Sequence, residues 1–248
     1  MGVSFSLVFL VPICFAAIHL LEFTGIMARL SGIRAKSHML GYSIQQAVYV
    51  GTRLFIVALL PMLGLIVDTR IDAKQYMVMA ISALAGAAIL SLSAYILHGY
   101  FVGYYDSVIL KYKKSGNFAT SFFSTAKGQD RSSVSIIERI NLILSNTEGR
   151  RILIQSAIVF AIYGTGIFIS FYFALLNFEY RASISQLSGV VNSIGTVLLT
   201  FFIEPRISRG IDAEREDAED LIHALLIGRL FGVAVLGQVI LMLAFVIG

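Results

Sequence analysis

The chain has 248 residues, of which 57% are apolar and 14% are charged, and its formal net charge is +4. This composition is too apolar and too poor in charge for a water-soluble enzyme. Apolar runs long enough to cross about 30 Å of hydrocarbon recur along the chain, whereas the strands of an outer-membrane barrel would alternate. The sequence therefore predicts an all-α, polytopic membrane protein.

Six transmembrane helices are expected, because a segment in lipid must satisfy its own backbone hydrogen bonds. In chain order they are expected at about residues 3–30, 38–67, 75–104, 151–176, 183–204 and 224–247, within a single integral membrane domain. The first run is too long for a signal-peptide core and is interpreted as a retained helix. Residues 105–150 form a long connection between two sets of three helices. Because each set has an odd number of helices, the second set enters the membrane from the side opposite to the first. This is the geometry of a 3+3 inverted arrangement.

The distribution of Lys and Arg predicts the orientation. Fourteen of these 19 residues lie in the first, third and fifth connections, and three lie in the second and fourth. By the positive-inside rule, the odd-numbered connections face the cytoplasm and both termini lie outside. In the long connection, residues 134–144 place Ile and Leu on one face, which indicates a helix lying on the cytoplasmic leaflet. Acidic residues around Arg215, in the fifth connection, are interpreted as a solvated face.

The first expected helix carries three ionisable residues on one side. At about 100° per residue, His19, Glu22 and Arg29 fall within an arc of roughly 80°. Such groups at membrane depth cost at least a few kcal/mol each, so they normally face a bundle interior or a wet cavity. In a structural interpretation, His19 and Glu22 form a buried hydrogen-bonded pair and Arg29 extends to the interface. In a functional one, the titratable pair couples transport to protons.

Arg53 lies far from either end of the second expected helix, with seven apolar residues between it and Pro61. Arginine is always charged, so a buried one needs an anionic partner. Two partners are open: Glu22 as a permanent counter-ion, or a phosphate that comes and goes. Asp68 follows Pro61 at the outer end of the same helix, where the proline is expected to kink or break it.

The last two expected helices carry two further polar residues of interest. Arg229, five residues into the sixth helix, either extends to the cytoplasmic interface or has a functional role. Asn192, in the fifth, belongs to a stripe of small and polar residues, which indicates close helix packing or hydrogen bonds to a sugar or amide.

Several motifs of catalysis are missing from the sequence. It contains no GxxxxGK[ST] loop, no HExxH and no paired metal-ligand cluster, so neither a metal nor a cofactor is expected. No Ser, His and Asp arrangement with supporting context suggests nucleophilic hydrolysis. Nothing in the sequence indicates a nucleic-acid partner. These absences argue against nucleotide-driven transport, zinc proteolysis and nucleophilic hydrolysis by this chain alone.

The residues singled out above resemble the Amj-type lipid II flippases, the family named as alternate to MurJ in bacterial cell-wall synthesis. The N-terminal signature is carried by Ile18, His19, Glu22, Arg29, Gly32, Ile33, Arg34, Ser43, Arg53, Pro61, Gly64, Val67 and Asp68. A second patch consists of Gly189, Asn192, Thr196, Pro205 and Asp212. The chain departs from the family pattern at Ala35, Gln46 and Glu204, where Thr, Asn and Asp are expected. These departures bear on the substrate more than on the fold.

The resemblance implies a transporter, not an enzyme, which moves undecaprenyl-pyrophosphate-linked lipid II from the inner to the outer leaflet of the bacterial cytoplasmic membrane. On this hypothesis the pyrophosphate is bound by arginines, namely Arg29, Arg34, Arg53 and Arg229. On the same hypothesis, proton coupling or gating is carried out by His19, Glu22 and Asp68. Polar contacts to the head group are made by Gln46, Asn192 and Glu204. Six helices are few for so large a head group, so a homodimer or an outward-splayed groove is expected.

Three alternatives remain open. The cargo is another polyprenyl-linked glycan, such as an O-antigen or capsule unit. The chain is a membrane-embedded enzyme acting on polyprenyl phosphates, with His19 and Glu22 as acid and base. Or it is a structural membrane subunit in which Arg53 belongs to a permanent ion pair.

Overall fold

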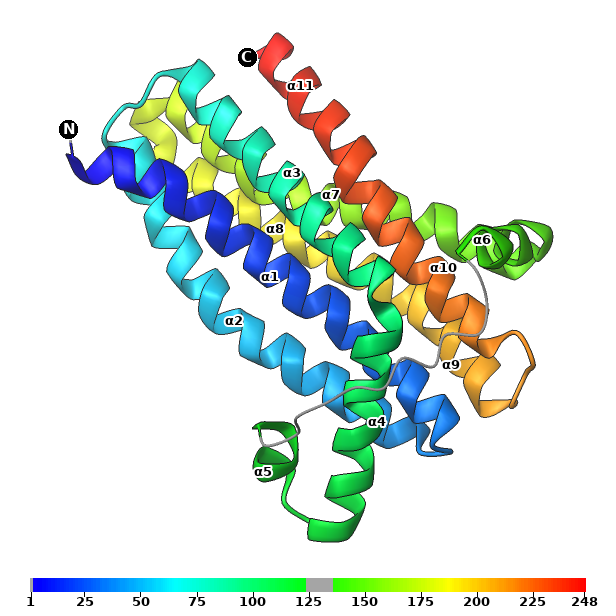
Figure 1. The fold of residues 1–248 in the computed structure, drawn as a ribbon. Helices are drawn as coiled ribbons and strands as arrows, with labels where there is room; N and C mark the ends of the chain where they lie inside the picture. Colours follow the sequence, from blue (N-terminus) through cyan, green and yellow to red (C-terminus); the bar gives the residue numbers. More distant parts are fainter. Residues whose placement is uncertain (1, 124–135) are drawn as a thin grey trace.

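The computed structural model describes residues 2–123 and 136–248 (Figure 1). All regular elements in these ranges are helices, and no strand occurs within them. Six stretches are long and apolar enough to cross a membrane: Ser6–Arg34, His38–Asp68, Ala73–Ile96, Thr147–Leu176, Phe178–Asp212 and Ala218–Ile247. The predicted all-α architecture with six transmembrane helices is therefore confirmed.

Four of the stretches are formed by one helix each or nearly so, and two are composite. The elements are α1 (Gly2–Arg34), α2 (His38–Asp68), α3 (Ala73–Ile96), α7 (Thr147–Leu176), α8 (Arg181–Leu198), α9 (Glu204–Asp212), α10 (Ala218–Phe231) and α11 (Gly237–Ile247). A π-helical turn, η2 (Leu199–Ile203), joins α8 to α9, and a second, η3 (Gly232–Leu236), joins α10 to α11. A 3-10 turn, η1 (Phe178–Tyr180), precedes α8. Such π turns are rare and are frequently found at functional sites.

The third transmembrane helix is shorter than the sequence predicts. It was expected to reach residue 104, but α3 ends at Ile96, and the chain bends at Leu97 into a separate helix, α4 (His98–Ser115). The aromatic residues after the bend continue the apolar pattern, which is why the pattern alone does not show the break. The long connection therefore contains three helices, α4, α5 (Phe118–Phe123) and α6 (Ile136–Ser145).

Side-chain caps fix where α3 and α7 begin. The Asp72 carboxylate accepts hydrogen bonds from the backbone N–H groups of Lys74 and Gln75, at 2.9 and 3.2 Å. The Asn146 side chain accepts one from the N–H of Glu148 at 2.9 Å, so α7 starts at Thr147, about one turn before the predicted residue 151. Each cap satisfies helix N–H groups that have no partner within the helix.

Glycines let the backbones of neighbouring helices approach closely. In α2, a Cβ on Gly41 would lie 2.7 Å from the carbonyl oxygen of Ala28 and 2.8 Å from the Cα of Gly32, both in α1. In the second half, a Cβ on Gly232 would lie 2.4 Å from the carbonyl oxygen of Ala157 in α7. Small residues at such contacts are typical of helix packing in membranes, where apolar burial from water gives no driving force.

The two halves repeat one packing pattern in opposite directions. α1 packs against α2 and α3, and α7 packs against α8 and α10. α1 runs away from the end that holds both termini, whereas α7 runs toward it (Figure 1). This is the packing that a 3+3 inverted arrangement predicts. Below, the end with α4, α5 and α6 is called the basic end, because it holds most of the Lys and Arg of the connections.

The helix predicted on the leaflet surface corresponds to α6, which begins at Ile136; Val134 and Ser135 lie outside the described residues. Ile143 is fully buried, while Ile137 is 74% exposed. Arg139, expected on the polar face, is buried and donates a hydrogen bond to Asp220 of α10 at 2.9 Å. α6 is therefore docked on the bundle on one side and retains exposed apolar residues on the other.

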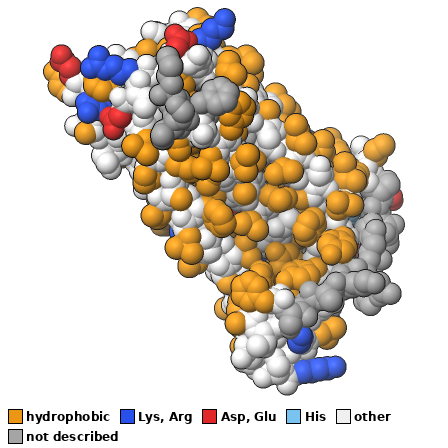
Figure 2. Space-filling view, turned by 60° about the vertical axis from the view of Figure 1, so that its left-hand side comes forward, with side chains coloured by type: hydrophobic (Ala, Val, Ile, Leu, Met, Phe, Trp, Pro, Cys, Tyr) orange, Lys and Arg blue, Asp and Glu red, His pale blue; other side chains and the backbone are white. Residues whose placement is uncertain are grey.

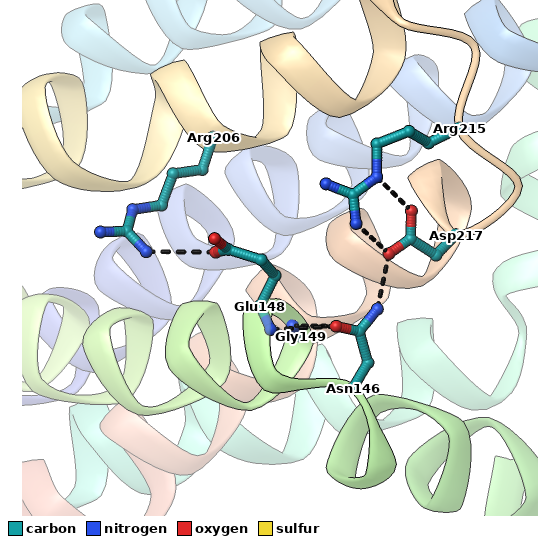
Figure 3. Close-up of polar contacts among 6 residues, drawn as sticks. All are labelled: Asn146, Glu148, Gly149, Arg206, Arg215 and Asp217. Carbon is teal, nitrogen blue, oxygen red and sulfur yellow. Dashed lines mark hydrogen bonds and ion pairs between the residues drawn. The ribbon is translucent and has the colours of Figure 1, made fainter.

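The sequence indicates that the acidic segment around Arg215 is a solvated face, but in the structure the segment also contacts other helices. The Asp217 carboxylate accepts hydrogen bonds from Arg215 and from Asn146 at the start of α7 (Figure 3). On the same side, Arg206 of α9 pairs with Glu148 of α7 at 3.1 Å. Groups that are distant in sequence therefore hold α7, α9 and α10 together at the basic end.

The lateral surface is apolar over the middle of the molecule. Figure 2 shows a broad band of hydrophobic side chains on one face, with charged side chains gathered toward its two ends. α2 and α8 contribute exposed apolar residues to the lateral surface, among them Val50, Leu54, Val190 and Ile194. An apolar band between charged ends is the surface that a bilayer requires.

Candidate functional site

A buried ion pair joins the two halves of the bundle. Arg229 of α10 donates from Nη2 to Oε2 of Glu22 in α1 at 2.7 Å, and the two side chains are 1% and 0% exposed. The ion pair links α1 to α10, and its two residues lie 207 positions apart in the sequence. Two charges of opposite sign in hydrogen-bond contact avoid the several kcal/mol that each would cost alone in this environment.

Polar neighbours complete this pair. The Thr52 hydroxyl donates to the second oxygen of Glu22 at 3.1 Å, and Arg229 Nη1 donates to the Tyr49 hydroxyl at 3.2 Å. His19 Nδ1 lies 3.5 Å from Arg229 Nη2. The guanidinium also lies over the Phe160 ring, with its carbon 4.6 Å from the ring centre. We call Glu22, Arg229 and His19 with these neighbours the buried charge network.

The network changes two expectations for the arginines. Arg229 does not extend to the interface, because it points into the bundle and is paired with Glu22. Glu22 is therefore not the counter-ion of Arg53. The expectation of Glu22 as a permanent partner of Arg53 is wrong, which leaves the phosphate that comes and goes. The structure buries His19 and Glu22 and brings each of them to Arg229 Nη2. Among the described residues no hydrogen bond joins the two side chains, so the hydrogen-bonded pair of the structural interpretation does not form.

Arg53 lies on a cavity beside this network. It is the middle residue of α2, with 15 residues on either side, so about 22 Å of helix separates it from each end. The cavity has a volume of about 170 Å³. Its lining comes from α2, α7 and the α8 to α9 stretch: Tyr42, Gln45, Gln46, Tyr49, Arg53, Val159, Phe160, Tyr163, Gly195, Thr196, Leu199, Thr200 and Glu204. We call it the central cavity.

No carboxylate among the described residues forms an ion pair with Arg53. Within residues 2–123 and 136–248, the ion pairs engage seven other arginines, and none of them involves Arg53. Glu204, on the same cavity, is paired with Arg29. A guanidinium at mid-depth without a fixed counter-ion is suited to a transient anion, and its planar fork of donors matches a phosphate.

The ion pair of Arg29 and Glu204 lies at the edge of the central cavity. Arg29 Nη1 donates to Glu204 Oε2 at 2.7 Å, with the side chains 3% and 18% exposed. The guanidinium carbon of Arg29 also lies 5.6 Å from the centre of the Tyr42 ring. Arg29 is therefore held within the protein and does not extend to the interface as in the structural interpretation.

Three of the predicted site residues lie away from the central cavity. Asp68 pairs with Arg181 at 2.7 Å at the end that holds the termini, where both side chains are largely exposed. Arg34 pairs with Glu219 at 3.3 Å at the basic end. Asn192 lies between α8 and α7, and its Oδ1 is buried without a hydrogen-bond partner among the described residues.

The sequence did not single out several cavity residues that the structure shows. Tyr49 contacts Arg229, and Tyr163 and Thr200 also line the central cavity. Tyr49 had a signal, because it lies four residues before Arg53 and therefore on the same helical face. Tyr163 and Thr200 had none, since only the packing of α7 against α2 and of η2 against α7 brings them to the site.

The donor set of the cavity suits an anion with polar neighbours. One guanidinium, phenol and threonine hydroxyls and glutamine amides converge on it. Among the described residues, no group of three His, Cys, Asp or Glu side chains is arranged to hold a metal ion.

A scan of family models matches residues 14–247 to the family Amj, described as alternate to MurJ. This chain belongs to the Amj family.

Comparison with curated proteins and with solved structures gives no match. The match to the Amj family extends over all six transmembrane helices, including the complete central cavity and the buried charge network. The resemblance inferred from the order of His19, Glu22, Arg29 and Arg53 is therefore confirmed at the level of the family.

Proposed function

We propose that this Amj-family protein is a lipid II flippase, a transporter that moves the undecaprenyl-pyrophosphate-linked peptidoglycan precursor across the bacterial cytoplasmic membrane. The observation that carries the proposal is Arg53, a guanidinium at mid-depth on a polar cavity and without a carboxylate partner in the described structure. The family description, alternate to MurJ, supports the same cargo.

The cavity accounts for the pyrophosphate group of such a lipid. Arg53 donates charge-assisted hydrogen bonds to phosphoryl oxygens, which are stronger than bonds between neutral groups. Gln46 and Glu204, on the lining, are placed to contact the polar head group. Arg29 becomes a second pyrophosphate ligand once Glu204 releases it. In this proposal Arg229 acts through Glu22 and Tyr49, because its guanidinium is already occupied.

The apolar surface accounts for the tail. α2 and α8 border the central cavity, and both expose apolar side chains laterally. A polyprenyl chain therefore stays in the bilayer while the head group crosses along the protein. This supports an outward-splayed groove over a homodimer, the other expected solution to the size of the head group.

Orientation and energy coupling complete the proposal. The basic end faces the cytoplasm and both termini face outward, by the positive-inside rule.

His19, beside Arg229, is the group through which protonation alters the buried charge network. Asp68 and Arg181, paired at the outer end, close the path on that side. Asn192 supplies a buried amide oxygen that the head group satisfies.

The test of the function is rescue of bacteria depleted of their own lipid II flippase. We expect expression of this chain to restore growth and to restore outer-leaflet lipid II, detected with an impermeant reagent that cleaves exposed lipid II. A matched strain defective in flipping an O-antigen or capsule lipid serves as the comparison. Rescue of only that second strain, at equal membrane expression, would assign the protein to another polyprenyl-linked glycan.

A further inference from the structure

A second cavity lies on the basic-end side of the central cavity. Its volume is about 310 Å³, and it is lined by Arg29, His38, Met39, Tyr42, Ser208, Ile211 and Asp212. These residues come from the ends of α1 and α2 and from α9, all at the basic end (Figure 1). We call it the entry cavity.

One ion pair separates the two cavities. Arg29 lines the entry cavity, Glu204 lines the central cavity, and their side chains meet at 2.7 Å. Tyr42 lines both cavities, with its ring beneath the Arg29 guanidinium. The ion pair of Arg29 and Glu204 therefore lies between the two cavities.

The backbone at Glu204 is suited to movement. Glu204 directly follows the π-helical turn Leu199–Ile203 and directly precedes Pro205. A proline has no N–H to donate, and both features are recognised causes of helix kinks. A rotation of α9 about this point is the movement that would separate Glu204 from Arg29.

We propose that the ion pair of Arg29 and Glu204 is a gate that an anionic phosphoryl group opens by taking the place of the Glu204 carboxylate on Arg29. The exchange replaces one anion with another on the same guanidinium, so Arg29 never loses its counter-charge. The pyrophosphate of a lipid then reaches Arg53 in the central cavity. The identity of the lipid that passes this gate rests on the proposed function. The ion pair as a barrier between the two cavities does not.

The gate is tested by access to a cysteine in the central cavity. The chain has one cysteine, so Cys14→Ala gives a cysteine-free background, and Val159→Cys places a reporter on the lining at a residue that is 6% exposed. A neutral, membrane-impermeant methanethiosulfonate is added from the basic-end side of membrane vesicles. We expect Glu204→Gln to raise the labelling rate about tenfold, which corresponds to about 1.4 kcal/mol of closing free energy. Inorganic pyrophosphate is expected to raise the rate of the reporter protein in the same direction.

Two matched variants separate gating from general loosening. Glu204→Asp keeps the charge and should retain slow labelling. Asp217→Asn breaks the ion pair with Arg215, which has no part in the proposed transport path, and should leave the rate within about twofold. Equal rates with and without Glu204→Gln, or an equal rise in Asp217→Asn, would overturn the gate. Because labelling requires no lipid transport, a failed gate and a failed flippase assignment give different results.

Discussion

Arg229→Met is expected to lower the free energy of unfolding by about 3–5 kcal/mol, since it leaves the Glu22 carboxylate buried without its cation. Glu22 is 0% exposed, and the Thr52 hydroxyl, which also donates to it, is neutral, so it does not replace the charge of the guanidinium. The measurement is reversible unfolding of the purified protein in detergent micelles, followed by circular dichroism.

Two further variants make this result specific to the pair. The double variant Glu22→Gln with Arg229→Met removes both charges and should recover most of the loss. Arg181→Gln breaks an exposed ion pair and should cost no more than about 1 kcal/mol. If Arg229→Met were as mild as Arg181→Gln, the buried charge network would not exist in the folded protein.

Arg53→Gln is expected to reduce lipid II translocation about 10-fold to 100-fold and to leave stability nearly unchanged. The guanidinium supplies hydrogen bonds to a charged group, each worth about 1.5–3 kcal/mol, and each 1.4 kcal/mol is tenfold. Stability changes little because, in the described part of the chain, no carboxylate is paired with Arg53 and would be left without its cation. The readout is outer-leaflet lipid II in cells depleted of their own flippase.

The control for Arg53→Gln is Arg151→Gln, which removes an exposed arginine of α7 that does not line the central cavity. We expect it to translocate at the wild-type rate. Arg53→Lys should fall between the two, because a lysine keeps the charge but loses the planar fork. Wild-type translocation by Arg53→Gln would remove Arg53 from the pyrophosphate site.

The sequence predicts the transmembrane helices well because hydrophobic length is a local property. It places α1, α2 and α7 through α11 to within a few residues, apart from the early starts of α7 and α10 and the late end of α9. It misses the bend at Leu97, where the aromatic start of α4 continues the apolar run. It also misses the π turns, which are set by packing and leave no distinctive residue pattern.

The ionisable residues of the site can be recognised in the sequence, but their partners cannot. His19, Glu22 and Arg29 stand out, because charge at membrane depth is costly wherever it occurs. Their ion pairs depend on tertiary packing, since Arg29 reaches a carboxylate 175 positions away. For the same reason the sequence leaves Glu22 open as a partner of Arg53, and only the structure pairs it with Arg229.

The most direct test of lipid II flipping through the central cavity is translocation by the purified protein in liposomes that contain fluorescent lipid II. We expect lipid II to move between leaflets faster with the wild-type protein than in protein-free liposomes, and Arg53→Gln to abolish most of this gain. Equal rates for the wild-type protein, for Arg53→Gln and for protein-free liposomes, with the protein folded and inserted, would contradict the assignment of the central cavity to lipid II.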